Sequence, residues 1–181
     1  SDFSVSNITG LTIGTISNTS NVTISSDQTV AGPISIYGDD IIVSGDMTSS
    51  ASNEDILLKA QGYIYTNDGY DFTTNGGDLI LWSNSANATS GTANNEVDLR
   101  GNNTVSTSGG NIILAGGLDS NNDGIPDGYA YRSYNDAIKA ADLGANVSLD
   151  SGGGEIVIRG QGVSHGVSAT GTGVIVNSGA G

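Results

Sequence analysis

The chain lacks cysteine and has only two prolines, and basic residues, aromatic residues and long apolar runs are all scarce. Without cysteine there are no disulfides, so we expect stability to come from stacked strands. No apolar run approaches the ~18 residues of a membrane-spanning helix, so membrane insertion is not expected. The opening Ser1-Asp2-Phe3 is not a secretion signal, and we interpret the chain as a mature internal fragment.

Basic residues are too few to balance the acidic ones. The 181 residues include five lysines and arginines against nineteen aspartates and glutamates, which leaves a formal net charge of −14. A surface of that sign repels phosphate backbones and anionic membranes, so nucleic acid is not an expected partner. Divalent cations are expected partners instead.

Five short segments repeat one pattern, in which a Gly, Asn or acidic lead-in precedes three aliphatic residues. The aliphatic triplets are Ile41–Val43, Ile56–Leu58, Leu79–Leu81, Ile112–Leu114 and Ile156–Ile158. Each is too short to bury its own apolar face, so a core forms only if such strands stack. The first residues of successive triplets are 15, 23, 33 and 44 positions apart. This irregular spacing predicts an all-β parallel solenoid with coils of roughly 20 residues and inserted loops.

The predicted solenoid is a single domain over residues 1–181, with about eight coils stacked ~4.8 Å apart into a rod roughly 40 Å long. Residues 118–144 break its pattern and are predicted to be an insertion. They contain an acidic loop, three tyrosines and a run of helix formers from Asn135 to Gly144. This run predicts a short helix of one to three turns on the side of the solenoid.

Strand alternation has a consequence for the middle residues of the five triplets. If the flanking aliphatics face the core, the middle residues point outward and form one exposed stripe. They are Ile42, Leu57, Ile80, Ile113 and Val157. A monomer rarely leaves such a stripe uncovered. We therefore expect it to be covered, either by the insertion around Ile138 and Leu143 or by a neighbouring chain.

Together with the triplets, the segments Ala31–Gly38, Asp55–Ala60 and Gly77–Ser83 resemble the β-strand repeats of large secreted bacterial surface proteins of the filamentous-haemagglutinin-like kind. The resemblance implies a right-handed β-helical stalk in a long exported protein, often an adhesin or a secreted filament. It brings no catalytic residues with it.

The sharpest local motif is an oxygen-rich loop from Asp119 to Asp127. Side-chain oxygens at relative positions 1, 3, 5 and 9 and a Gly at 6 match the front of a calcium loop, where the backbone carbonyl at position 7 also binds. The predicted Ca²⁺ ligands are Asp119, Asn121, Asp123, Ile125 through its carbonyl, and Asp127. Ala130 stands where an EF-hand has Glu, so the loop is not an EF-hand. It is similar to the calcium loops of thrombospondin type 3 repeats. The alternative is an acidic surface turn without metal.

Three further patterns have both a functional and a structural interpretation. Carboxylates that precede the triplets could form a catalytic column or simply occupy turns; they are Asp39, Asp40, Asp55, Asp78 and Glu155. Aromatic residues could grip sugar rings or pack in a coil corner; they are Tyr63, Tyr65, Tyr70, Phe72 and Trp82. The single histidine, His165, fits a polar turn better than a catalytic triad.

The sequence therefore predicts a structural or adhesive segment of a secreted bacterial surface protein, without enzymatic activity. It would form part of an extended stalk or filament and display loops. Its expected partners are neighbouring repeats or copies of the same chain, together with cell-surface or matrix glycans. The alternative is a carbohydrate-binding or polysaccharide-cleaving module.

Overall fold

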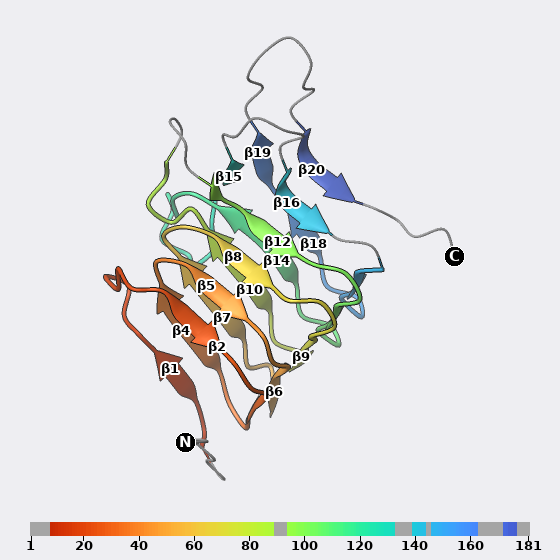
Figure 1. The fold of residues 1–181 in the computed structure, drawn as a ribbon. Coiled ribbons are helices and arrows are strands. Elements are labelled where there is room, and N and C mark those ends of the chain that lie inside the picture. Colours follow the sequence, from red (N-terminus) through yellow and green to blue (C-terminus); the bar gives the residue numbers. More distant parts are fainter. Residues whose placement is uncertain (1–7, 89–93, 133–138, 144–145, 163–171, 177–181) are drawn as a thin grey trace.

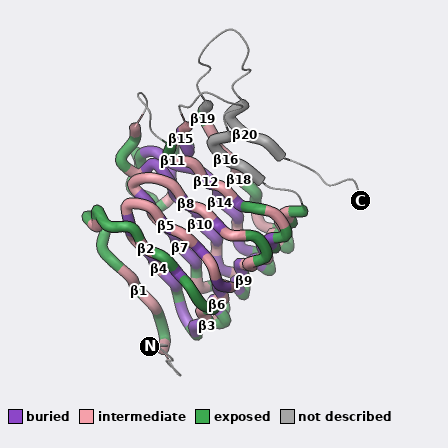
Figure 2. Tube along the Cα trace, viewed as in Figure 1, coloured by how far each residue is buried: buried purple, intermediate pink, exposed green. Residues whose placement is uncertain are grey.

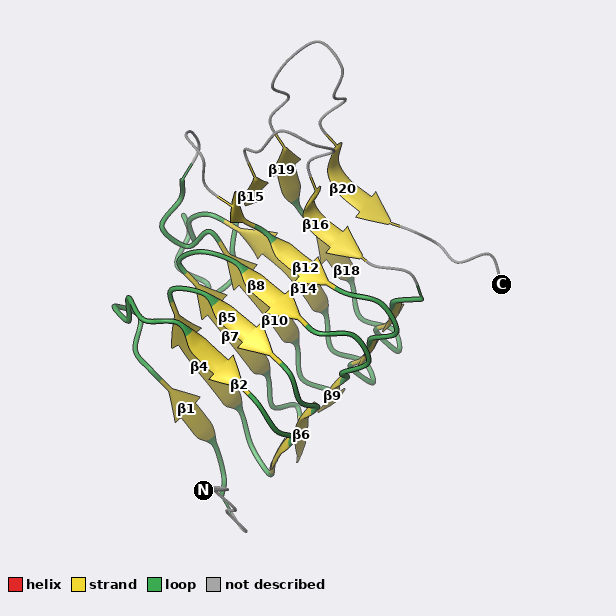
Figure 3. Ribbon diagram, in the orientation of Figure 1, coloured by secondary structure: helices red, strands yellow, loops and turns green. Residues whose placement is uncertain are grey.

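The computed structural model describes residues 8–88, 94–132, 139–143, 146–162 and 172–176. Within these ranges the chain is made of short strands joined by turns, and it contains no helix (Figure 3). None of the described residues belongs to a helix long and apolar enough to cross a membrane. Three large sheets, each with parallel strands only, form the body of the molecule (Figure 1). The expectation of an all-β fold with parallel strands is confirmed.

The chain visits the three sheets in turn, so strands within each sheet follow in sequence order. The first sheet contains β1 (Leu11–Ile13), β4 (Ile34–Gly38), β7 (Ile56–Ala60), β10 (Leu79–Ser83), β14 (Ile112–Gly116) and β18 (Ile156–Ile158). The second contains β2 (Val22–Ile24), β5 (Ile41–Val43), β8 (Ile64–Thr66), β12 (Val97–Leu99), β16 (Lys139–Leu143) and β20 (Thr172–Val176). The third contains β3 (Gln28–Val30), β6 (Met47–Ser52), β9 (Phe72–Asn75), β13 (Thr104–Ser106) and β17 (Ser148–Asp150).

Alternation along each strand places aliphatic residues in a core between the sheets. In β7, Ile56 and Leu58 are fully buried while Leu57 between them is only half-buried. Parallel pairing in register then places the aliphatic residues of successive strands beside one another, with Ile34 beside Ile56 and Ile56 beside Leu79. The result is one continuous apolar cluster running along the stack (Figure 2).

The register of the first sheet explains the irregular spacing of the triplets. Its first column holds Leu11, Ile34, Ile56, Leu79, Ile112 and Ile156, at steps of 23, 22, 23, 33 and 44 residues. Strand repeats of roughly 20 residues with insertions agree with the predicted spacing, and within the described residues the column has six rungs where about eight coils were expected. The triplet Ile41–Val43 was assigned to the wrong column, because it lies in β5 of the second sheet. Three consecutive aliphatic residues predict a strand that contributes side chains to the core, but they do not predict which of the three sheets the strand joins.

The two longer steps come from insertions at the corner between the first and second sheets, and a third insertion follows β18 at the same corner. They carry β11 (Asn94–Asn95), β15 (Ala130–Arg132) and β19 (Gly160–Gly162). β11 pairs antiparallel with β15, and β15 pairs parallel with β19. Insertions from consecutive windings therefore build a small fourth sheet beside the main stack (Figure 1).

The helix predicted over residues 135–144 is wrong for the part that the structure describes. Lys139–Leu143 forms β16, in which Ala141 lies beside Val97 and Leu143 beside Leu99. A helix of one to three turns is marginal by itself, whereas a strand here continues the parallel ladder from β12. The insertion is correspondingly shorter than predicted. Residues 135–138 and 144 lie outside the described residues.

Carboxylate and carboxamide oxygens link successive windings at the corner before the first sheet. Asp55 Oδ1 accepts a hydrogen bond of 2.7 Å from the backbone N–H of Asp78. Asp78 Oδ1 accepts one of 2.7 Å from Asn111, and Asn111 Oδ1 accepts one of 2.8 Å from Glu155. The lead-in residue of each triplet thus holds the next winding in register. A second ladder of the same kind joins Asp27, Asp46, Asp71 and Thr104.

The glycines of the lead-in allow consecutive windings to approach closely. A Cβ atom on Gly110 would lie 2.0 Å from the carbonyl oxygen of Gly77, and one on Gly77 would lie 2.1 Å from that of Glu54. Neither position has room for a side chain. The recurring Gly-Gly before an Asp or Asn is therefore a requirement of the stacking.

Candidate functional sites

An apolar stripe runs along the outer face of the first sheet. Leu57, Ile80, Ile113 and Val157 occupy one outward column. Ile80 and Ile113 are nevertheless buried, and with Trp82 and Ala115 they form a second apolar cluster outside the main core. The predicted stripe is confirmed for these four residues. It is wrong for Ile42, which lies in β5 on the second sheet.

The acidic loop, residues 117–128, covers this stripe. Ile125 packs against the second apolar cluster. At the start of the loop, the carbonyl oxygen of Gly117 accepts a hydrogen bond of 2.8 Å from Trp82 Nε1. Cover by the insertion is therefore confirmed, but Leu143 does not provide it, because it lies in β16 of the second sheet. Ile138 lies outside the described residues.

Two cations lie where the acidic loop meets the outer face. Arg159 Nη1 donates a hydrogen bond of 2.8 Å to the carbonyl oxygen of Pro126. Lys59 Nζ lies 3.2 Å from the centre of the Trp82 ring. Burial lowers the pKa of the Lys59 ammonium, and the Asp119 charge opposes that shift. Trp82 is thus covered from two sides, by a cation and by the loop backbone.

All five predicted calcium ligands lie in the acidic loop, and in the structure they shape its turns. Asp119 accepts hydrogen bonds from the N–H groups of Asp123 and Gly124, at 3.1 and 2.9 Å. Asn121 Oδ1 also accepts from Asp123, at 3.0 Å, and Asp123 Oδ1 accepts from Ile125, at 2.9 Å. The loop therefore brings three of the predicted ligands together around shared backbone donors.

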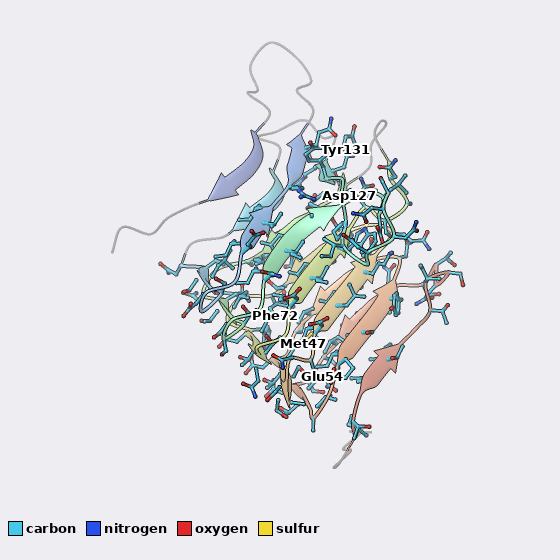
Figure 4. The ribbon with its side chains drawn as sticks, turned by 180° about the vertical axis from the view of Figure 1, so that it is seen from behind. Met47, Glu54, Phe72, Asp127 and Tyr131 are labelled. Atoms are coloured by element: carbon cyan, nitrogen blue, oxygen red, sulfur yellow. The ribbon has the colours of Figure 1, made fainter. Side chains whose placement is uncertain are left out.

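Asp127, the last predicted side-chain ligand, closes the acidic loop at its base (Figure 4). Its Oδ2 accepts a hydrogen bond of 2.8 Å from Ser120, and its N–H donates one of 2.9 Å to the carbonyl oxygen of Leu118. The oxygen donors are of the type that calcium takes. Across the described part of the chain, however, no three or more His, Cys, Asp or Glu side chains form a metal-binding group.

The second candidate site is a pocket of about 330 Å³ on the outer face of the second sheet, which we call the tyrosine pocket. Its floor is an outward column in which Ile42 lies beside Tyr65 and Tyr65 beside Asp98. Tyr63 lines it one position before β8. The remaining lining residues are Asn94 from β11, and Glu96 and Arg100 on either side of β12.

Two ion pairs organise the polar rim of the tyrosine pocket. Arg100 Nε lies 3.3 Å from Asp98 Oδ2, and Arg132 Nε lies 3.1 Å from Glu96 Oε2. The Arg100 guanidinium also stacks 4.0 Å from the centre of the Tyr65 ring. Arg100 therefore covers one face of the Tyr65 ring, and Tyr63 adds a second aromatic side chain to the pocket lining.

Burial perturbs two groups at the side of the pocket nearest β5. It raises the pKa of the Asp40 carboxyl, with Asp39 adding to the rise, while a hydrogen bond of 3.2 Å from the Tyr63 N–H to Asp40 Oδ1 opposes it. Burial also raises the pKa of the Tyr63 hydroxyl, reinforced by Asp40 and Glu96. The Tyr63 hydroxyl is therefore a neutral hydrogen-bonding group at neutral pH.

The structure separates the aromatic residues into different environments. Trp82 belongs to the covered stripe, and Phe72 is buried in the core beside Met47 (Figure 4). Tyr63 and Tyr65 flank the buried Ile64 and face outward. Phe72 and Trp82 are thus packed, but on strands β9 and β10 and not in a coil corner, whereas the two tyrosines line a pocket.

The predicted carboxylate column is split between corners. Asp55, Asp78 and Glu155 share one corner, where the first two accept backbone hydrogen bonds. Asp40 lies at another corner, between Asn21 and Tyr63. His165 lies outside the described residues.

Sequence reasoning missed the polar half of the tyrosine pocket. Glu96, Asp98 and Arg100 alternate with the buried Val97 and Leu99. That period of two predicts a strand with one charged face. It is the sequence pattern from which the polar half of the pocket could have been predicted. No local sequence pattern indicated that β11 and Arg132 lie beside the pocket, because their placement depends on pairing between two insertions.

No family model, curated protein or solved structure matches this chain.

Proposed function

We propose that this chain is a segment of a right-handed parallel β-solenoid that serves as a structural stalk in a secreted bacterial surface protein. Its role is mechanical, to extend the stack and to display the corner insertions, and adhesion is the biological outcome. No catalytic role is proposed. The surface location rests on the resemblance to haemagglutinin-like repeats and on the acidic composition.

The observation that carries the proposal is the contrast between the middle and the ends of the stack. Ile56 and Leu79 are fully buried in the middle of the first column, whereas Ile156 on its last rung is 45% exposed. At the other end, Leu11 and Ile13 are half-buried beside an opening of about 430 Å³. Apolar rungs and strand edges at both ends favour continuation by similar windings or by copies of the chain.

A charge placed on an end rung tests this continuation. We expect the chain to form elongated assemblies as its concentration rises, seen by sedimentation velocity and small-angle scattering. Ile13→Glu should keep the chain monomeric, because the charge enters the open end of the core. Thr73→Glu is the matched control, since Thr73 is exposed on β9 in the middle of the third sheet, away from both ends of the stack. A parent chain that stays monomeric at every concentration, or an Ile13→Glu chain that still assembles, would contradict end-to-end stacking.

Calcium binding by the acidic loop is the second part of the proposal. Asp119, Asn121, Asp123 and Asp127 would supply side-chain oxygens and Ile125 its carbonyl, and the cation would neutralise carboxylates that repel one another. At about 100 times Kd, calcium should raise the melting temperature by ~5–10 °C. Asp119→Asn combined with Asp123→Asn should abolish the rise, whereas Asp39→Asn should preserve it. A melting temperature that changes with neither calcium nor chelator would contradict calcium binding, and the loop would then be a surface turn without metal.

The alternative function is carbohydrate binding or polysaccharide cleavage. The tyrosine pocket favours binding, because it combines an aromatic face with polar groups at one place on the surface. Cleavage lacks comparable support, since Asp55 and Asp78 are engaged in the corner ladder. A reducing-sugar assay on candidate polysaccharides should accordingly give no turnover.

A further inference from the structure

We propose that the tyrosine pocket binds a neutral saccharide of about one or two rings. This inference is independent of the stalk role, because it rests on the outer face of the second sheet and not on the ends of the stack. Its volume of about 330 Å³ lies at the small end of the ~300–1,000 Å³ typical of small-molecule sites. One or two sugar rings fit that size better than a long chain does.

The apolar side of the pocket suits the hydrocarbon face of a sugar ring. Tyr63 and Ile42 line the pocket and both are half-buried, so each keeps some surface open to solvent. Tyr65 is backed by the Arg100 guanidinium, which fixes the ring and adds donors at its edge. Aromatic and aliphatic surface beside fixed polar groups favours an amphipathic ligand over a purely polar one.

The polar side of the pocket offers both acceptors and donors. Glu96 and Asp98 supply carboxylate oxygens, while Arg100 and the Asn94 carboxamide supply N–H groups. A hydroxyl both donates and accepts, so a ring with several hydroxyls matches this mixture. Because the ion pairs hold the two carboxylates in place, less side-chain freedom is lost on binding.

The charge balance selects a neutral ligand over an ionic one. Both arginines at the rim are paired, Arg100 with Asp98 and Arg132 with Glu96. Asp40 adds negative charge nearby, and the whole chain carries −14. A sugar with carboxylate or sulfate groups would be repelled, and a cationic amino sugar would have to compete with the arginines already in place.

The experiment is a titration of the ¹⁵N-labelled chain with neutral sugars, after a glycan array has identified which of them it binds. The array carries mono- and disaccharides of glucose, galactose, mannose, fucose and N-acetylglucosamine, with uronic acids and glucosamine as charged probes. Concentrations up to roughly 10 mM reveal a Kd of ~1 mM. We expect shifts confined to Ile42 and to residues 63–66 and 94–100, and no response to the charged probes.

Two variants locate the site. Tyr63→Ala should weaken binding by about tenfold or more, because it removes one of the two aromatic side chains that line the pocket. Tyr37→Ala is the matched control, since Tyr37 is half-buried on β4 of the first sheet, and it should leave Kd unchanged. Circular dichroism establishes that both variants keep the fold.

Each other outcome overturns the proposal in a different way. Absence of binding by every neutral sugar would refute the site. Preference for the charged probes would refute the ligand class, and equal losses in Tyr63→Ala and Tyr37→Ala would refute the location. None of these results would touch the stalk proposal, which depends on association at the ends of the stack.

Discussion

The outer faces of the first and second sheets share one backbone plan but have different surfaces. Both present a column of outward residues, and both lie next to the corner that carries the insertions. On the first sheet this column holds Ile80 and Ile113, and the acidic loop covers it. On the second it holds Tyr65 and Asp98, and a pocket remains open. An insertion thus packs over the apolar column of the first sheet, whereas beside the polar column of the second the insertions contribute Asn94 and Arg132 to the rim of an open pocket.

The largest expected effect comes from removing the centre of the covered face. Trp82→Ala should lower the free energy of unfolding by ~3–5 kcal/mol, because it empties a buried aromatic site and removes the bond to Gly117. Tyr65→Ala, at an outward position of the second sheet, should cost only ~1 kcal/mol or less. Urea unfolding of the two variants measures the contrast. Equal losses would mean that the two faces do not differ as described.

A smaller effect is expected from weakening the cover itself. Ile125→Ala should cost ~1–2 kcal/mol, less than the ~2–5 kcal/mol of a fully buried isoleucine, since Ile125 is half-buried. The variant should also bind more of an apolar dye, because the stripe beneath is uncovered. Leu118→Ala is the control within the same loop. Leu118 is 53% exposed, so its loss should stay within ~0.5 kcal/mol.

The smallest effect concerns the edge of the open pocket. Burial raises the pKa of Asp40 above its ordinary value of 3.8, so the folded chain holds more protons than the unfolded chain between the two values. Stability contributed by this group therefore falls as pH rises through that window. Asp40→Asn should give a small gain in stability at pH ~7 that shrinks at pH ~3. Chemical denaturation of the Asp40→Asn variant at both pH values measures the sign of the change in stability. A loss of stability at neutral pH would contradict the prediction.

Local features of the fold could be predicted from the sequence. The triplets correctly marked strands whose first and third residues face the core, as Ile56 and Leu58 do, because alternation is a property of the strand itself. The outward stripe followed from the same alternation, which did not by itself decide whether the insertion or a neighbouring chain covers it. The spacing likewise revealed windings of roughly 20 residues with inserted loops.

Features that depend on distant pairing could not be predicted. Ile41 looks like the first residue of any other triplet, and only its partners Val22 and Ile64 place it on the second sheet. The sequence of Lys139–Leu143 by itself favours a helix. It forms a strand because the edge of β12 offers backbone groups with which it pairs. The candidate sites divide in the same way: the acidic loop is one contiguous motif, whereas the tyrosine pocket joins residues from three windings.

By itself, the sequence determined that the aliphatic triplets form strands and that the first and third residues of each triplet face inward. Both follow from two-residue alternation, which is a property of the strand itself. Tertiary structure alone decided which strands share a column, which residue covers the apolar stripe, and that Tyr63 and Glu96 line one pocket. Such outcomes depend on pairing between residues 19 or more positions apart, and hydrogen bonds across windings select among locally equivalent strands.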